Sequence, residues 1–358
     1  MKLNKIYSGN LREPLRSMAK KVFIILPFIF IILSAFLNGY SQDIHFSQYF
    51  SSPLILNPGL TGQFDGDYRI ISNYKNQWGS ISGFPFETIS VSTDKSFLKN
   101  KLSGGFLFYK DKAGDSKMGI NQINFSLGSR VSFDDKNSIS TGIQGGWAQR
   151  SIDVSNLTWD SQYDGKTFNK ALFSGENTAP VNFNYFDINA GTYYKGVVND
   201  LLSFNAGIAA FHLNNPKQSY FENKDKLHVK WTFHGGAAIG FKNWNKTLLP
   251  TFMILQQGGA REINIGVAMK YNLGMDSKYT GINVSSNIVF GGYYRLKDAL
   301  IAYTRYDFKD IFSLGFSYDI NLSKLRTASY SRGGAEVFLS FTIRRSNVTV
   351  QTGDKIKE

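Results

Sequence analysis

The chain has 358 residues, a formal net charge of +13, 15% aromatic residues and no cysteine. The lack of cysteine excludes both a disulfide framework and a lipid anchor on cysteine. A basic charge of this size is compatible with nucleic-acid binding, but the basic residues are spread along the chain and form no basic helix or known motif. The charge fits contact with an anionic surface glycolipid or a negatively charged partner better.

Residues 1–41 have the layout of a secretory signal peptide. Two lysines precede the apolar run 22–37, and small or polar residues follow it, with processing expected near Ser41. A transmembrane anchor is the alternative, but a run of about 16 residues is short for a bilayer, and Pro27 interrupts it. Met18 is an alternative start. Removal of 1–41 takes away six basic residues and one acidic residue and leaves a charge of +8.

The next segment, 42–66, does not have the pattern of a strand. Pro53 and Pro58 would break a hydrogen-bonded ladder, and the sequence Asn-Pro-Gly at 57–59 is a turn signal. The segment is nevertheless rich in apolar and aromatic residues. Such a segment has to be buried against another part of the protein.

Most of the following sequence alternates between apolar and polar residues. In 312–321 the apolar positions are Phe312, Leu314, Phe316, Tyr318 and Ile320. The range 263–272 shows the same alternation. Because side chains of a strand point alternately to opposite faces, each such segment has one apolar and one polar face. Strands of about ten residues with this pattern indicate an all-β fold, a transmembrane antiparallel β-barrel. The lumen or periplasmic mouth of that barrel would bury 42–66, which we expect to plug or floor it.

The barrel is expected to span 67–344 with fourteen strands, an even number as bacterial single-chain barrels have. The expected strands are 68–78, 86–95, 102–111, 119–132, 138–150, 185–195, 202–213, 229–241, 248–256, 262–272, 283–294, 299–306, 311–320 and 335–344. If the first strand leaves the periplasm, the long links 151–184, 214–228 and 321–334 lie outside. The shorter links 133–137, 242–247 and 307–310 then lie inside.

The outer link 151–184 carries more aromatic residues than a solvated loop needs. It contains Trp159, Tyr163, Phe168 and Phe173 among polar residues and glycine. These four residues are candidates for contact with a partner. Inward folding of the link and a plain surface loop are the alternatives.

The end of the chain, 345–358, is a polar stretch that we expect to be a periplasmic tail. Many outer-membrane barrels end on an aromatic residue that is read during assembly. Here that signal would have to lie inside the last strand, around Phe338 and Phe341, or the tail serves as a handle for another component.

The sequence offers little support for an enzyme. Two of the four histidines, His228 and His234, lie roughly 20 Å apart along one strand, too far to share a metal ion. No motif of a hydrolase or metalloprotease is present. We therefore predict no catalytic, metal or cofactor site, although a site assembled from several strands stays open. A passive porin or ligand transporter remains the main alternative function, because the polar, glycine-rich face suits water.

Two parts of the sequence carry a resemblance to a known family. The first is QDIHFSQYFSSPLILNPGLTG (42–62) followed by DYRIISNYKNQWGSI (67–81). The second comprises 291–301, 314–325 and 332–341 near the end of the chain. They resemble the PorP/SprF family of type IX secretion system membrane proteins. The matching residues are His45, Phe46, Ser47, Gln48, Pro53, Leu56, Asn57, Pro58, Gly62, Arg69, Asn73, Tyr74, Gln77, Trp78, Gly292, Arg295, Asp298, Ala299, Tyr318, Asp319, Asn321, Gly333, Gly334 and Glu336.

The resemblance implies a multi-pass barrel in the outer membrane of a Bacteroidota-type bacterium. Members of the family serve protein secretion or gliding motility together with other components of that machinery. The expected partners are a secreted, adhesin-like surface protein, those other components, and outer-membrane lipid and glycolipid. We favour a dedicated partner for one large surface protein, since most copies are of that type. A core component linked to the periplasmic ring is the alternative within the family.

Overall fold

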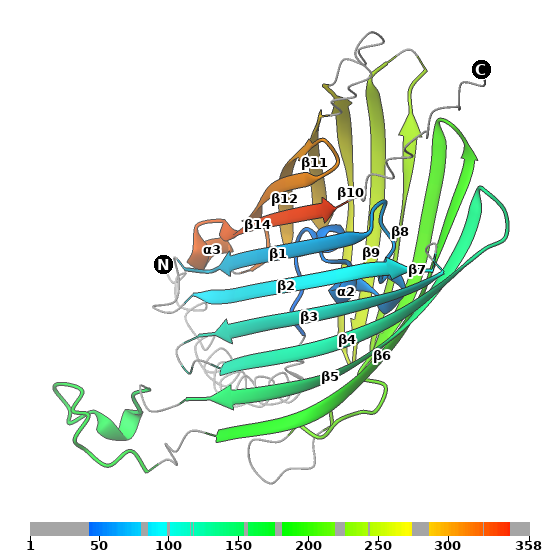
Figure 1. Ribbon diagram of the computed structural model, residues 1–358. Coiled ribbons are helices and arrows are strands. Elements are labelled where there is room, and N and C mark those ends of the chain that lie inside the picture. The colour runs from blue at the N-terminus through cyan, green and yellow to red at the C-terminus, as the bar shows by residue number, and fades with distance from the viewer. Residues whose placement is uncertain are drawn as a thin grey trace, which may run out of the picture. The chain divides into compact units, whose positions relative to one another are not determined.

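The computed structural model describes residues 43–79, 85–98, 101–114, 116, 118–153, 157–175, 181–218, 226–242, 244–273, 286–324 and 326–343. The expected signal peptide, 1–41, and the expected tail, 345–358, lie outside the described residues. The rest of the chain forms one unit, in which fourteen antiparallel strands close into a barrel (Figure 1).

Each strand pairs with its neighbours in sequence, and β1 closes the barrel against β14. The strands are β1 (Tyr68–Gln77), β2 (Phe86–Phe97), β3 (Leu102–Ala113), β4 (Met118–Ser132), β5 (Asn137–Ile152), β6 (Val181–Asn199), β7 (Leu202–Phe211), β8 (Lys230–Gly240), β9 (Lys246–Gln257), β10 (Ala260–Asn272), β11 (Ser286–Arg295), β12 (Ala299–Phe308), β13 (Phe312–Asn321) and β14 (Arg332–Ile343). The short helices are η1 (Tyr49–Ser51), α2 (Pro53–Leu56), η2 (Pro58–Leu60), η3 (Asp160–Gln162) and α3 (Arg326–Ser329).

The predicted number and order of strands are confirmed, and most strand ends differ by a few residues. The largest difference concerns β5 and β6, which extend further into the expected link 151–184. Ile152 pairs with Val181, so the two strands continue as a ribbon beyond the predicted ends. The last strand also begins earlier than predicted, at Arg332. Alternation alone could not place these ends, because a ribbon leaving the membrane no longer needs an apolar face.

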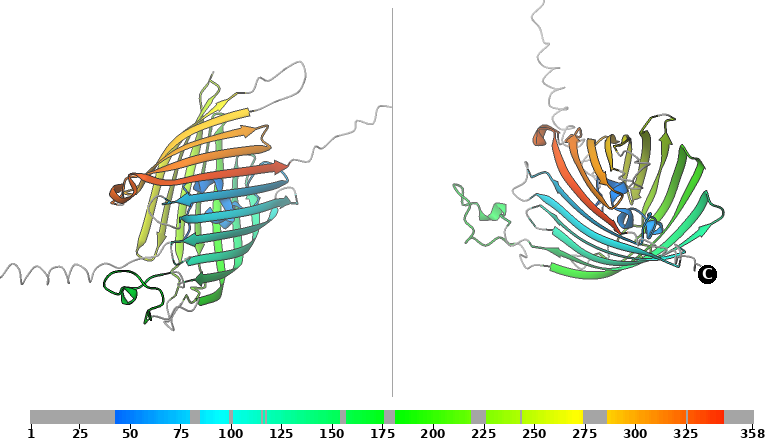
Figure 2. Two further views of the ribbon diagram at one scale, coloured as in Figure 1. Left: turned by 90° about the vertical axis from the view of Figure 1, so that its left-hand side faces the viewer. Right: turned by 45° about the horizontal axis from the view of Figure 1, so that its top comes forward.

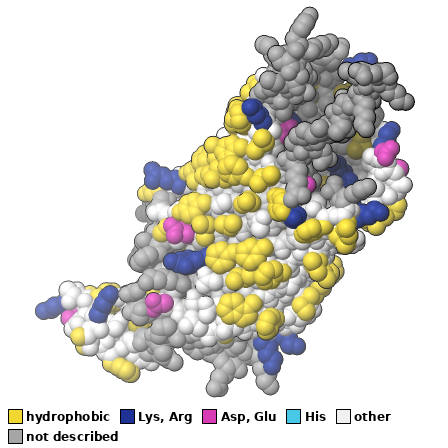
Figure 3. Space-filling model, in the orientation of Figure 1, with side chains coloured by type: hydrophobic (Ala, Val, Ile, Leu, Met, Phe, Trp, Pro, Cys, Tyr) yellow, Lys and Arg dark blue, Asp and Glu magenta, His cyan; other side chains and the backbone are white. Residues whose placement is uncertain are grey.

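The apolar face of the alternating pattern lies outside the barrel. In β13, Leu314 and Phe316 are exposed, whereas Ser317 and Asp319 are buried inside. Figure 3 shows hydrophobic side chains gathered on the outer surface over β1 to β5. An apolar outer wall around a polar interior is the arrangement that a barrel in lipid requires.

The two ends of the barrel differ in the length of their links. One end carries the long links 153–180, 212–229 and 322–331, and we call it the outer mouth. The other end carries turns of two to five residues such as 133–136 and 200–201, one longer link, 273–285, and the start of β1 and the end of β14, and we call it the inner mouth. Because outer-membrane barrels have long extracellular loops and short periplasmic turns, the outer mouth is the cell-surface end.

The barrel is not empty. Residues Asp43–Gly62, which we call the lumen segment, lie within the wall as three short helical turns, η1, α2 and η2 (Figures 1 and 2). Glycines of the wall allow this segment to approach closely. A Cβ atom at Gly142 would lie 2.1 Å from the carbonyl oxygen of Pro58, so a larger residue at that position would force the two apart.

Candidate functional site in the lumen and at the outer mouth

The lumen segment owes its compact form to its two prolines and one asparagine. Pro53 begins α2 and Pro58 begins η2, where a missing backbone N–H costs no helical hydrogen bond. The Oδ1 atom of Asn57 accepts a hydrogen bond of 2.7 Å from the amide of Gly59 and so caps η2. The proline residues that exclude this segment from the wall therefore fold it into short helical turns.

Apolar side chains of the lumen segment pack against inward-facing apolar residues of the wall. Leu54 belongs to a buried cluster with Leu107, Tyr109 and Tyr185. The ring of Phe50 lies 5.0 Å from that of Tyr303. The further apolar contacts of the segment involve Tyr293, Met253, Ile120, Ala148 and Leu227. Inward apolar residues are costly in a water-filled channel, and here they serve as the binding surface for the segment.

The first polar anchor joins the N-terminal and C-terminal family motifs. Glu336 accepts hydrogen bonds from the backbone amides of Ser47, at 2.7 Å, and Gln48, at 3.0 Å. The hydroxyl of Ser47 donates to Asp319 at 2.8 Å. Nη2 of Arg295 in turn lies 2.6 Å from the same carboxylate of Asp319. All five residues are buried. The charged groups of Glu336, Asp319 and Arg295 are therefore stabilised by their protein partners instead of by water.

A second anchor holds the stretch around His45. Nζ of Lys75 donates a hydrogen bond of 2.9 Å to the backbone carbonyl of His45. Nδ1 of His45 lies 3.4 Å from Glu262.

The third anchor, which we call the outer clasp, ties down Asp43. Nε2 of His212 lies 2.5 Å from Asp43, and Nδ1 lies 2.8 Å from Asp187. Nζ of Lys230 lies 3.1 Å from Asp43, and the amide of Asp43 donates to Gln257. Burial disfavours a charged imidazole, but the carboxylates of Asp43 and Asp187 outweigh it and raise the pKa of His212 to about 9. The clasp is thus a buried network of two carboxylates and two cations.

The outer clasp is expected to weaken as the pH rises. Because the pKa of His212 is raised, its contribution is complete below about 6.5 and is lost as the pH passes about 9. By linkage this contribution is on the order of 3 kcal/mol. Amide hydrogen exchange of residues 44–46 should therefore show falling protection factors between pH 7 and pH 10. The variant His212→Gln should lack that dependence, and an equal fall in the variant would contradict the assignment.

Asn57 anchors the middle of the lumen segment. Its Nδ2 atom donates to the carbonyl of Thr192 at 2.8 Å and lies 3.0 Å from Nε2 of His234. A Cβ atom at Gly191 would lie only 2.0 Å from Oδ1 of Asn57, so the glycine leaves the space that the Asn57 side chain occupies. Asn57 is completely buried, and these contacts explain why an amide with both donor and acceptor atoms fits this position.

The last anchor lies near the inner mouth. Ser103 donates to the carbonyl of Thr61 at 2.7 Å, and the amide of Gly62 donates to Asp94 at 2.8 Å. Asp94 also receives two hydrogen bonds from Arg69, at 2.6 and 3.0 Å. Gly62 has a φ of +73° and no space for a Cβ atom, so glycine is required there.

The residues of the two predicted motifs lie at several places in the barrel. His45, Phe46, Ser47 and Gln48 are in the outer half of the lumen, where Ser47 binds Arg295 and Asp319 and Arg295 also binds Asp298. Asn57, Pro58, Gly62 and Arg69 lie further in. Gln77, Trp78, Gly334 and Asn321 lie at the outer ends of β1, β13 and β14. Asn73 faces the lumen and donates to Ser90, whereas Tyr318 and Gly292 face outward.

Several anchoring residues were missed as candidate site residues by the sequence analysis. They are Asp43, Lys75, Asp94, Asp187, His212, Lys230 and Glu262. Each is a titratable residue on the inward face of a strand or beside the lumen. A barrel filled only with water would not require a charged residue at these particular positions. Charge at such positions is the signal that could have identified them.

The aromatic residues of the outer link form a small folded unit at 157–175. Tyr163 and Phe168 pair across a turn in which Asp164 accepts hydrogen bonds from two backbone amides. Their rings lie 5.5 Å apart, and Trp159 precedes η3. Phe173 is 87% exposed, more than Tyr163 at 49% or Phe168 at 55%. Of the four predicted contact residues, Phe173 is therefore the most available to a partner.

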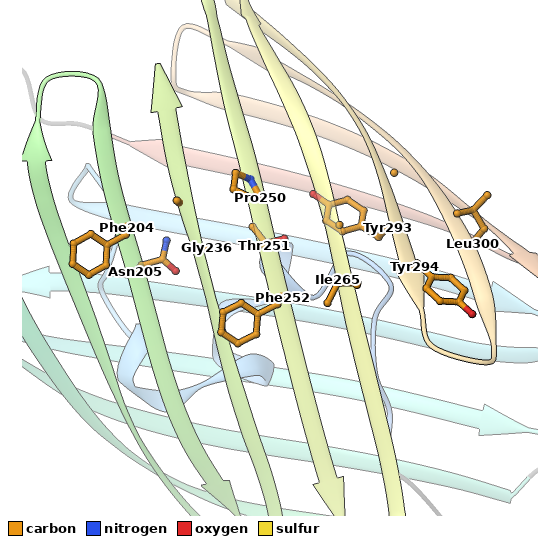
Figure 4. Close-up of a pocket in the computed structure, with 13 residues that line it drawn as sticks. Phe204, Asn205, Gly236, Pro250, Thr251, Phe252, Ile265, Tyr293, Tyr294 and Leu300 are labelled. Atoms are coloured by element: carbon orange, nitrogen blue, oxygen red, sulfur yellow. The ribbon is translucent and has the colours of Figure 1, made fainter. Parts of the chain in front are cut away.

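The wall itself has an apolar hollow of about 900 Å³, lined by β7 to β12 (Figure 4). Its rim is made of outward side chains, among them Phe204, Phe252 and Leu300. Pro250 lies within it, at a place where the pairing of β8 with β9 is interrupted. Its lining also includes Thr251 and Tyr293, which contact Tyr49 of the lumen segment, so the hollow opens on the outer face and reaches into the wall.

A closed antiparallel barrel with an apolar wall defines an outer-membrane β-barrel protein. Residues 38–341 match the family model described as type IX secretion system membrane protein PorP/SprF. The match covers most of the chain, which therefore belongs to this family and is located in the outer membrane. The family resemblance of the two sequence motifs is thus confirmed.

Comparison with solved structures finds other outer-membrane barrels. The toluene transporter TbuX of Ralstonia pickettii is 11% identical, with a TM-score of 0.49, and the match covers 86% of this chain and 96% of that one. The toluene transporter TodX of Pseudomonas putida is 7% identical, with a TM-score of 0.44, covering 81% and 91%. The monoaromatic hydrocarbon channel CymD is 8% identical, with a TM-score of 0.44, covering 86% and 95%. Likenesses this weak carry no conclusion about function.

A search of curated proteins finds no match to this sequence. Within the part of the chain that the structure describes, no helix has the length and apolar character needed to cross a membrane.

Proposed function

We propose that this protein is a dedicated partner in the export or surface anchoring of one large, adhesin-like protein by the type IX secretion system. The observation that carries the proposal is the occupied lumen. Anchors along the lumen segment, from Asp43 to Gly62, bind it to the wall, and its apolar side chains fill the space between. A barrel with this interior is suited to binding protein rather than to conducting small solutes.

The passive porin is disfavoured by the same contacts. A porin keeps its lumen filled with water, and its inward residues are free to select solutes. Here inward residues such as Glu336, Asn124 and Asp319 are buried, and Glu336 and Asp319 bind the lumen segment. The barrel would have to release this segment before a solute of any size could pass.

Contact with the exported protein is assigned to the outer mouth. The unit 157–175 presents Phe173, and exposed aromatic residues are the usual anchors of binding energy in an interface. Other secretion components would contact the inner mouth, and outer-membrane lipid and glycolipid would contact the wall and its rims. The family and the placement of these surfaces support the three assignments.

Replacing Phe173 with alanine is expected to weaken cargo binding without unfolding the barrel. Loss of an interface anchor costs about 2 kcal/mol or more, which is a fall in affinity of roughly thirtyfold. The tagged variant should recover much less of the large surface protein from solubilised outer membranes. Tyr330→Ala is the matched control, because Tyr330 is also an exposed aromatic residue, at 83%, in another outer link. Equal recovery of the large surface protein with both variants would show that the contact lies outside 157–175.

A further inference from the structure

The lumen segment has a direction, and its first described residue lies at the outer mouth. Asp43 contacts His212, which directly follows the outer end of β7. It also contacts Lys230, the first residue of β8, and Gln257, the last residue of β9. All three partners are at strand ends on the side of the long links. Asp43 is therefore at the cell-surface end of the lumen.

The other end of the segment lies at the opposite side of the membrane. Gly62 is bound to Asp94, close to the inner end of β2, and Thr61 to Ser103, the second residue of β3. The chain then reaches the inner mouth, where the amide of Asp67 donates to the carbonyl of Ile343, the last residue of β14. From Asp43 to Asp67 the chain thus passes through the lumen from the outer to the inner mouth.

The length of the segment is sufficient for this path. β1 has ten residues, or roughly 33 Å of strand, and the tilt of barrel strands shortens the distance across the membrane further. A chain as long as the lumen segment can extend to roughly 70 Å, which leaves enough length for three helical turns.

We infer that the amino-terminal end of the processed chain is presented to the cell surface at the outer mouth. This conclusion rests on the contacts of Asp43 and on the orientation of the barrel, and it does not depend on which partner is exported. It makes the outer mouth a composite surface, in which the amino-terminal end lies next to the start of the link 212–229. A partner outside the cell can thus reach both the end of the lumen segment and the outer loops.

Labelling of intact cells tests the inference, because the chain contains no cysteine that would interfere. A short epitope containing one cysteine is placed immediately before Asp43, after the leader. A large maleimide that cannot cross the outer membrane should label it in intact cells as efficiently as Tyr330→Cys in the outer link 322–331. Asp135→Cys, in the inner turn 133–136, should be labelled only after permeabilisation.

Labelling of the epitope only after permeabilisation would overturn the inference. If the epitope prevents folding, the pair Asp43→Cys and Gln257→Cys replaces it, since the amide of Asp43 and Oε1 of Gln257 are 3.0 Å apart. A short bismaleimide should join this outer pair and should fail to join Asp43→Cys to Asp94→Cys near the inner mouth. Cross-linking of the inner pair instead would reverse the direction of the segment and contradict the inference.

Discussion

A barrel that lacks residues 43–58 is expected to conduct ions freely, whereas the intact protein stays closed. The deletion removes the outer clasp, the contacts with Glu336 and the apolar side chains that fill the lumen. The wall remains, because its fourteen strands pair with each other independently of the segment. Single-channel recordings in planar bilayers should show a steady open level in place of rare, brief events. A barrel of fourteen strands is too wide for the inward side chains of the wall to fill its lumen alone, so an open channel remains once the segment is removed.

A matched control separates this effect from general damage to the barrel. Deletion of 157–172 removes a comparable length from the outer link, and it should leave the conductance at the level of the intact protein. Folding of both variants is checked by the shift in gel mobility on heating that intact outer-membrane barrels show. A folded barrel that stays closed after loss of 43–58 would reject the role of the lumen segment.

Replacing Arg295 with methionine is expected to destabilise the protein by about 3–5 kcal/mol, the cost of removing one partner from a buried ion pair. Arg295 binds Asp319 at 2.6 Å and Asp298 at 2.5 Å, and Nη1 lies 3.2 Å from the hydroxyl of Ser47. Without the guanidinium, Asp319 is left buried with no cation bound to it. The free energy of unfolding in detergent, measured with urea, should fall by this amount.

Two further variants test the cause of that loss. Arg295→Lys keeps the charge but cannot make all three contacts, so it should fall between the wild type and Arg295→Met. The double variant Arg295→Met with Asp319→Asn removes the unpaired charge and should recover part of the loss. If the double variant is less stable than Arg295→Met alone, the ion pair is not the source of the effect.

The wall of this protein could be predicted from its sequence, because lipid and lumen impose a period of two on each strand. Phe316 outside and Ser317 inside illustrate the rule, and the same rule holds around the barrel. Strand ends were less certain, since residues beyond the membrane are free of that constraint. β5 and β6 continue past the predicted ends for this reason.

The interior could be predicted only in outline. Two prolines and several aromatic residues indicated a segment that is buried away from the wall, and the family motifs named many of its residues. The contact partner of each residue depends on strand register and tilt, and neither can be predicted from the alternation of apolar and polar residues. Ser47 and Glu336 are 289 positions apart, and nothing in the sequence joins them. His212 belongs to no motif in the sequence, whereas in the barrel it lies between the carboxylates of Asp43 and Asp187.

The proposed role is tested most directly by the surface proteome of cells that lack this gene. Proteins exposed on intact cells are released by brief proteolysis and quantified by mass spectrometry, in the deletion strain and in the strain with the gene restored. The proposal predicts that one large protein disappears from the surface and returns on complementation, while other surface proteins stay at their normal levels. An unchanged surface would contradict a role in export, and loss of every protein exported by the type IX system would contradict a dedicated one.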